Sequence, residues 1–152
     1  MDLALFQPEI AGNVGTTLRT AACLGVAVHI IEPCGFPFSD AALKRAGMDY
    51  ATRANSRRHA DWAAFRSWSA AEGKRLVLLT TAGATPLPAF DFHPDDTVLL
   101  GSESAGAPPH VHDAAAARVA IPMRPGFRSL NVAVAAGIAL AEALRQTKGF
   151  PA

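Results

Sequence analysis

The stretch "TVLLGSESAG", residues 97–106, joins an apolar run to a loop in which two glycines flank a carboxylate and two hydroxyls. A short continuous apolar run is typical of a strand buried on both faces, as strands of parallel sheets are. The runs "RLVLLTT" (75–81) and "RVAIPM" (118–123) share this form. In open α/β sheets, ligands bind at the carboxyl ends of such strands. The stretch therefore predicts a parallel sheet with a binding loop at 101–106.

Glu103 is the only charged residue of that loop. The loop lacks the G-x-G-x-x-G pattern of dinucleotide-binding folds, and it lacks the lysine of a phosphate-binding P-loop. Glu103 has two interpretations that the sequence leaves open. It accepts backbone N–H groups and is structural, or it offers negative charge to a cationic ligand.

Strands and helices alternate along the rest of the chain. Further strands are predicted at 3–6 and 26–32, and helices at 14–25, 39–47, 60–73 and 129–146. The predicted helix ends are Gly25 and Gly47, and the predicted N-caps are Ser39 and Ser129. With 152 residues, the chain suits one domain spanning residues 1–152. The fold class is therefore α/β, with a mostly parallel sheet and helices on both of its faces.

The charge balance bounds the choice of partners. Fourteen Lys and Arg against thirteen Asp and Glu give a net charge of +1, which excludes a polybasic surface. Any nucleic-acid site must be a local cluster. The two cysteines, Cys23 and Cys34, the lack of a signal peptide and the lack of a membrane span favour a cytoplasmic protein. "HVHD" (110–113) has no partner ligands, so no metal site is expected.

Three further segments carry candidate functional residues. In "PEIAGNVGTTLRTA", Asn13 is either a helix cap or a ligand contact, and Arg19 is either functional or a surface arginine. "LLTTAGATPLP" (78–88) is either a second strand-end site or an ordinary loop. "IPMRPGFRSLN" (121–131) precedes a helix that is apolar on nearly every side. Such a helix is buried, and in so small a domain a second copy of the chain is the simplest cover.

A basic cluster lies in the middle of the chain. Its members are Lys44, Arg45, Arg53, Arg57, Arg58 and His59. They are either a solvated face that pairs with neighbouring aspartates or a surface for nucleic acid. Phosphate contacts would make binding depend on salt.

Taken together, these segments resemble the SPOUT methyltransferases, whose C-terminal chain is threaded into a deep trefoil knot. Among them the chain is most similar to the short, single-domain tRNA 2′-O-methyltransferases that modify the wobble nucleotide, position 34. The similarity runs from about residue 3 to residue 146 and includes "NVGTTLRTA", "HIIEPCGFPFSD", "LKRAGMDY", "LTTAG", "GSESAG" and "IPMRPGFRSLN". Two departures are Ala107, where relatives often have Leu, and the apolar Val132, Ala133 and Val134, where they often have Ser or Asn.

The resemblance implies a cofactor, a substrate and an assembly. The cofactor is S-adenosylmethionine (SAM), the substrate is the anticodon stem-loop of tRNA, and the enzyme is a homodimer. Because SAM carries a sulfonium and no phosphate, a loop without lysine suits it. A bulky replacement of Gly101 is expected to abolish binding by filling the ligand's space. Methylation of another RNA such as rRNA, or a knotted module that binds RNA or a nucleotide without catalysis, are the alternatives.

The resemblance also implies roles for individual residues. It places Arg19 and Asn13 at the catalytic centre, with Arg19 acting as a general base or as a clamp on a phosphate, in its own subunit or the partner's. The implied cofactor-binding residues are Leu79, Thr80, Thr81, Gly83, Gly101, Glu103, Gly106, Ile121, Met123, Ser129, Leu130 and Asn131. The implied tRNA-binding residues are Arg124 and Arg128 near the target nucleotide, with Lys44, Arg45, Arg57 and Arg58 farther along the stem.

Overall fold

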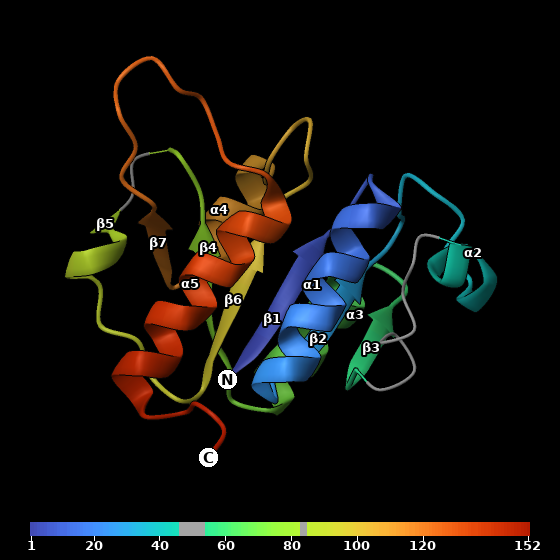
Figure 1. Ribbon diagram of the computed structural model, residues 1–152, viewed down its shortest axis with the longest axis horizontal. Coiled ribbons are helices and arrows are strands. Elements are labelled where there is room, and N and C mark those ends of the chain that lie inside the picture. Colours follow the sequence, from blue (N-terminus) through green and yellow to red (C-terminus); the bar gives the residue numbers. More distant parts are fainter. Residues whose placement is uncertain (46–53, 83–84) are drawn as a thin grey trace.

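The computed structural model describes residues 1–45, 54–82 and 85–152, and its described part is built around one parallel sheet (Figure 1). The strands are β1 (Asp2–Phe6), β2 (Ala27–Ile31), β3 (Ser56–His59), β4 (Arg75–Leu79), β5 (Thr85–Pro86), β6 (Asp96–Leu100) and β7 (Ala117–Ala120). The helices are α1 (Ala11–Leu24), α2 (Asp40–Arg45), α3 (Trp62–Ala71), the short 3-10 helix η1 (Leu87–Ala89), α4 (Pro109–Ala114) and α5 (Val132–Thr147). Gly47, Arg53, Gly83 and the side chain of Lys44 lie outside the described residues.

The strand order is β3-β2-β1-β6-β4-β7-β5, and every neighbouring pair is parallel. The five strands predicted from apolar runs are all present, so the predicted sheet is confirmed. Strands β3 and β5 were not predicted. Both lie at the edges of the sheet, where a strand is less buried and does not need a continuous apolar run. In β3, the side chains of Ser56, Arg57 and Arg58 are exposed.

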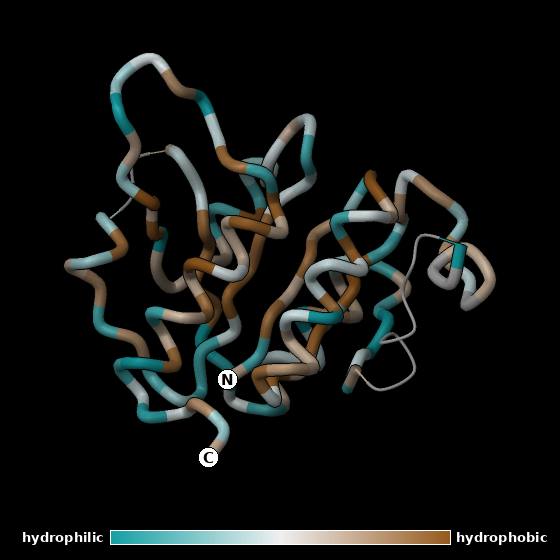
Figure 2. The backbone as a smooth tube through the Cα atoms, viewed as in Figure 1, coloured by the Kyte–Doolittle hydropathy of each residue, from teal (hydrophilic) through white to brown (hydrophobic). Residues whose placement is uncertain are grey.

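The core lies in two layers because alternate residues of a strand face opposite sides of the sheet. Leu3 and Leu5 of β1 pack with α1 and α5, whereas Ala4 and Phe6 pack with α3 and α4. Figure 2 shows the apolar colour along the central strands, with some apolar stretches in the outer loops as well. Helices therefore cover both faces, as predicted. In the described part of the chain, no helix is long and apolar enough to cross a membrane.

Of the predicted signals for helix ends, Gly25 and Ser39 are confirmed, Ser129 is wrong, and Gly47 lies outside the described residues. Gly25 adopts a left-handed conformation (φ 70°) and caps α1, and the Ser39 hydroxyl accepts a hydrogen bond from the Ala42 N–H (3.1 Å). The prediction that Ser129 caps the last helix is wrong. Asn131 does so instead, because its side-chain oxygen accepts the N–H groups of Ala133 (2.9 Å) and Val134 (3.3 Å).

Two histidines are buried between β2, β3 and α3. The Nδ1 of His29 lies 2.9 Å from the Nε2 of His59, and the His29 ring stacks on Trp68 at 3.8 Å between centroids. Burial lowers the pKa of His29 to about 4, with smaller opposing and reinforcing effects from Asp2, His59, Arg57 and Lys74. Burial, with Arg57 nearby, also lowers the pKa of His59. Both rings are therefore neutral at pH 7.

This pair predicts a loss of stability in mild acid. The unfolded chain takes up protons at its histidines near pH 6.5, whereas folded His29 does so only near pH 4. The free energy of unfolding should thus be retained above about pH 6.5 and fall by about 3 kcal/mol as the pH drops toward 4. Urea unfolding at several pH values measures this. His29→Phe should flatten the dependence, and an equally steep dependence in that variant would contradict the assignment.

Candidate functional site

A cavity of about 410 Å³ opens at the carboxyl ends of β4, β6 and β7. Its walls come from three loops, 79–81, 100–107 and 121–130, and from the first turn of α5. Ligand pockets in proteins usually enclose a few hundred to about 1,000 Å³. Three segments that are distant in sequence therefore meet where parallel sheets bind ligands.

The loop 101–106 is closed on itself by backbone hydrogen bonds. The Ser102 N–H donates to the Gly106 carbonyl (3.0 Å), and the Gly106 N–H donates to the Ser102 carbonyl (2.9 Å). Gly106 has φ +67°, a conformation that suits glycine. A Cβ on Gly101 would strike the backbone of Gly106 and Ala107. The expected intolerance of Gly101 to substitution thus has a different physical reason from the one inferred from sequence, because the loop itself fills that space.

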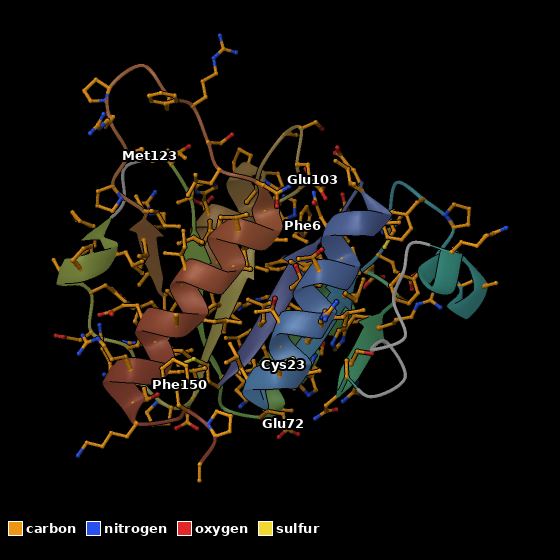
Figure 3. All side chains as sticks on the ribbon, viewed as in Figure 1. Phe6, Cys23, Glu72, Glu103, Met123 and Phe150 are labelled. Atoms are coloured by element: carbon orange, nitrogen blue, oxygen red, sulfur yellow. The ribbon has the colours of Figure 1, made fainter. Side chains whose placement is uncertain are left out.

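Glu103 joins this loop to the start of α1. Its Oε2 accepts the Glu9 N–H (2.8 Å), and its Oε1 accepts the Ile10 N–H (3.2 Å) and the Asn13 Nδ2–H (3.2 Å). A carboxylate at a helix N-terminus is also stabilised by the helix dipole. Figure 3 labels Glu103 in the loop that follows β6. Of the two interpretations of Glu103, the structure therefore favours the structural one.

Asn13 continues the same network toward the last helix. Its Oδ1 accepts a hydrogen bond from the Asn131 Nδ2 (2.9 Å), while Asn131 caps α5. Asn13 is not the cap of α1, because it is the third residue of that helix. Glu103, Asn13 and Asn131 thus tie three segments together around one side of the cavity. Asn13 and Asn131 are placed to position the site rather than to line it.

Most residues that were expected to bind a cofactor line the cavity. They are Leu79, Thr80, Thr81, Gly101, Glu103, Gly106, Ile121, Met123, Ser129 and Leu130. Asn131 does not line it, and Gly83 lies outside the described residues. The cavity is also lined by Ser102, Ser104 and Ala105, which belong to the predicted binding loop 101–106, and by Leu100, Ala107, Val132 and Ala135, which the sequence analysis did not name as cofactor-binding residues.

Arg19 does not line the cavity formed by the described residues of this chain. It lies on the exposed stripe of α1 with Gly12, Thr16 and Cys23, which recur at helical spacing. Helix α5 packs beside α1 (Figure 1) and carries a second exposed stripe with Val134 (51% exposed), Ile138 (40%) and Ala141. The sequence predicts that α5 is buried on nearly every side, but a single chain leaves one side of this helix exposed. Val134 and Ile138 remain uncovered on the face that holds Arg19.

The expected RNA-binding residues fall into two groups. Arg128 lines the cavity, and Arg124 is exposed in the same loop. Arg45 and Arg57 are exposed on α2 and β3. Arg58 forms an ion pair with Glu32, and its guanidinium lies 4.6 Å from the centre of the Phe38 ring. Of the aspartates expected as partners, Asp49 and the side chain of Asp40 lie outside the described residues.

Within the residues that the structure describes, no group of three or more His, Cys, Asp or Glu side chains is arranged to hold a metal ion. Among the described residues, the cavity walls carry one carboxylate, Glu103, and one guanidinium, Arg128, and the others are apolar, hydroxyl or glycine residues. The site can therefore hold a ligand of mixed polarity through backbone groups at the strand ends.

Comparison with known proteins gives consistent matches. Residues 1–141 match the model of the SpoU rRNA Methylase family. A protein of Ancylobacter novellus named tRNA (cytidine(34)-2'-O)-methyltransferase is 57% identical over 148 residues, 97% of this chain and 94% of that protein. A relative of the same name from Yersinia pestis is 36% identical over 156 residues, 99% of this chain and 96% of that protein.

Solved structures agree in fold. One, described as giving structural insights into the 2-OH methylation of C/U34 on tRNA, is 42% identical with a TM-score of 0.88, and the match covers 95% of this chain and 94% of that one. An AdoMet-bound rRNA methyltransferase from Sinorhizobium meliloti is 32% identical with a TM-score of 0.84, covering 94% of this chain and 55% of that one.

Proposed function

The chain belongs to the SpoU rRNA Methylase family, and on that premise we propose that it methylates the ribose 2′-OH of the wobble nucleotide, position 34, of tRNA, with SAM as methyl donor. The observation that carries the choice of substrate is the 57% identity over 97% of the chain to a protein named for this reaction. A tRNA substrate in turn favours a cytoplasmic enzyme, acting as a single domain.

The cavity suits SAM in size and chemistry. Its volume of about 410 Å³ accommodates a nucleoside-sized ligand, and its described walls hold no lysine that would select a phosphate. The residues that would hold it are the backbone at 79–81, 101–106, 121–123 and 129–130, with Leu100 and Val132 as apolar cover. When bound, SAM supplies a methyl group on a positively charged sulfur.

We expect the active form to be a homodimer built on the exposed stripes of α1 and α5. Val134 and Ile138 would lose contact with water there, which favours association. An obligate interface of this kind buries about 2,000 Å² or more. Arg19 lies in the α1 stripe and does not line the described walls of its own cavity, and we propose that this dimer brings it to the partner's cavity.

Arg19 is then the leading catalytic residue, and a phosphate clamp is its simplest role. A guanidinium group stays protonated in proteins, which argues against a general base. A bidentate grip on the phosphate next to the target ribose would align the 2′-OH with the methyl carbon. Alignment of this kind supplies much of the catalysis in a displacement reaction.

The tRNA surface must be local because the net charge is only +1. Arg128 lines the cavity and Arg124 is exposed in the same loop, so we propose that both meet the target nucleotide. Arg45 and Arg57 are exposed and suit phosphates farther along the anticodon stem, and Lys44 is proposed with them. Arg58 is the weakest member of this group, because Glu32 already balances its charge.

The C-terminal trefoil knot stays a proposal. It rests on the resemblance to the SPOUT methyltransferases. Such threading would fix the cavity walls against one another.

A ribosomal substrate is the second candidate, favoured by the family's description and by the Sinorhizobium meliloti structure. Purified protein incubated with methyl-labelled SAM and either tRNA or rRNA separates the two. Label should enter tRNA, and a 2′-deoxy nucleotide at position 34 should abolish incorporation. Incorporation of label into rRNA alone would show that rRNA, and not tRNA, is the substrate. Binding of S-adenosylhomocysteine without transfer to either RNA would favour a module that only binds.

A further inference from the structure

The loop 121–131 presents an aromatic ring to solvent beside the cavity. Phe127 is 72% exposed, more than any other large apolar residue in the described part of the chain. The loop rises from Met123 and stands beyond the ends of the strands (Figure 3). Phe127 is next in sequence to Arg128, which lines the cavity, but its own side chain does not line it among the described residues. The ring therefore stands at the rim of the site.

Local geometry holds the ring in this position. Residues 124–127 form a turn in which the Phe127 N–H faces the Arg124 carbonyl (3.4 Å). Pro125 occupies the second position, and Gly126 occupies the third with φ +92°. This arrangement is that of a type II turn, in which proline fixes one angle and glycine alone adopts the other without strain. The exposed ring is thus set on a stiff turn.

The residues near Phe127 in the sequence indicate which kind of partner binds to its exposed ring. Arg124 and Arg128 flank it in sequence and are both exposed. Cores of protein interfaces are depleted in charge, so an exposed ring in a turn that also carries two exposed arginines is a poor centre for a contact with a second copy of the chain. An aromatic ring flanked by cations suits unpaired nucleic acid, where bases stack on the ring and cations meet the phosphates.

We propose that Phe127 is a positioning residue that stacks on an unpaired nucleobase of the RNA substrate, at the methylated nucleotide or beside it, while Arg124 and Arg128 contact the adjoining phosphates. This role rests on the proposed function, and it assigns Phe127 to the part of the site that holds the base. Stacking would stop rotation of the target nucleotide while its ribose enters the cavity.

The test compares Phe127→Ala with Phe127→Trp on an anticodon stem-loop labelled with a fluorophore. Alanine should weaken RNA binding by about 10-fold, the effect expected for one stacked base. Tryptophan should restore affinity to near the parent's, and its added fluorescence should be quenched when RNA binds. The affinity for S-adenosylhomocysteine and the molecular mass by light scattering should stay unchanged in both variants.

A scan of the RNA identifies the stacked base. Stem-loops with one abasic nucleotide at position 33, 34 or 35 are titrated with the parent and with Phe127→Ala. At the stacked position, the abasic site should weaken binding of the parent but not of the variant. The proposal would be overturned if each of the three abasic sites weakened binding of the parent and of Phe127→Ala equally. Unchanged affinity of Phe127→Ala for the intact stem-loop, or a changed molecular mass of that variant, would also overturn it. The proposed function fails separately, if the parent transfers no methyl group to tRNA.

Discussion

Alanine in place of Arg19 is expected to lower kcat/KM for tRNA by at least about 100-fold, the cost of a misplaced reacting group. The loss follows from the proposed clamp, because without the guanidinium the target ribose is no longer aligned. Binding of S-adenosylhomocysteine should be retained, because the proposed clamp contacts a phosphate of the RNA and not the cofactor. Single-turnover methylation and calorimetry measure the two properties separately.

A matched control lies on the other side of the sheet. Arg66 belongs to α3, which packs against the opposite face from α1, so Arg66→Ala should leave methylation close to the parent's rate. Light scattering must show that Arg19→Ala is still a dimer. Normal turnover by a dimeric Arg19→Ala would remove the arginine from the reaction. A rate that climbs about tenfold per pH unit up to about pH 10 only with Arg19 present would restore the general-base role.

The sheet and the binding loops could be predicted because local sequence carries them. Apolar runs such as 75–79 and 97–100 favour buried strands through their own residues, without information on which strands they pair with. In the same way, the glycines Gly101 and Gly106 indicate a turn from the local sequence alone. Strand β3 could not be predicted in this way. It is held at the sheet edge by pairing with β2, and its exposed Arg57 resembles any solvated arginine.

Partners across the chain were beyond sequence reasoning. Glu103 and the Glu9 N–H are 94 positions apart, and only the fold brings them to 2.8 Å. The same limit explains the wrong helix cap, because Ser129 and Asn131 are both good caps and the chain path decides between them. The same limit applies to the position of Arg19. The resemblance assigned Arg19 to the catalytic centre, whereas the fold places it on the exposed stripe of α1.

Adding a single methyl group at Gly101 is expected to be nearly as damaging as losing Arg19, by a different route. The Cβ of Gly101→Ala would strike the backbone of Gly106 and Ala107, which the two Ser102–Gly106 hydrogen bonds hold in place. Overpacking against backbone costs enough to weaken S-adenosylhomocysteine binding by about 10- to 100-fold. Gly149→Ala is the matched control, because there the added atom meets the flexible end of Leu144 at 3.0 Å. Calorimetry should show the loss only in the first variant, and equal affinities in the two would contradict the loop geometry.

The two damaged variants together test whether Arg19 serves the partner subunit. Arg19→Ala and Gly101→Ala chains are co-expressed with different tags, and dimers carrying both tags are purified. If Arg19 acts across the dimer, one site combines the intact cavity of the first chain with the intact Arg19 of the second, while the other site carries both defects. Such a dimer should show about half of the parent's activity, since one of its two symmetric sites is complete. If Arg19 acts within its own chain, each site keeps one defect and the mixed dimer stays as inactive as its parents. If no species carries both tags, the dimer itself is wrong, and the uncovered Val134 and Ile138 require another partner.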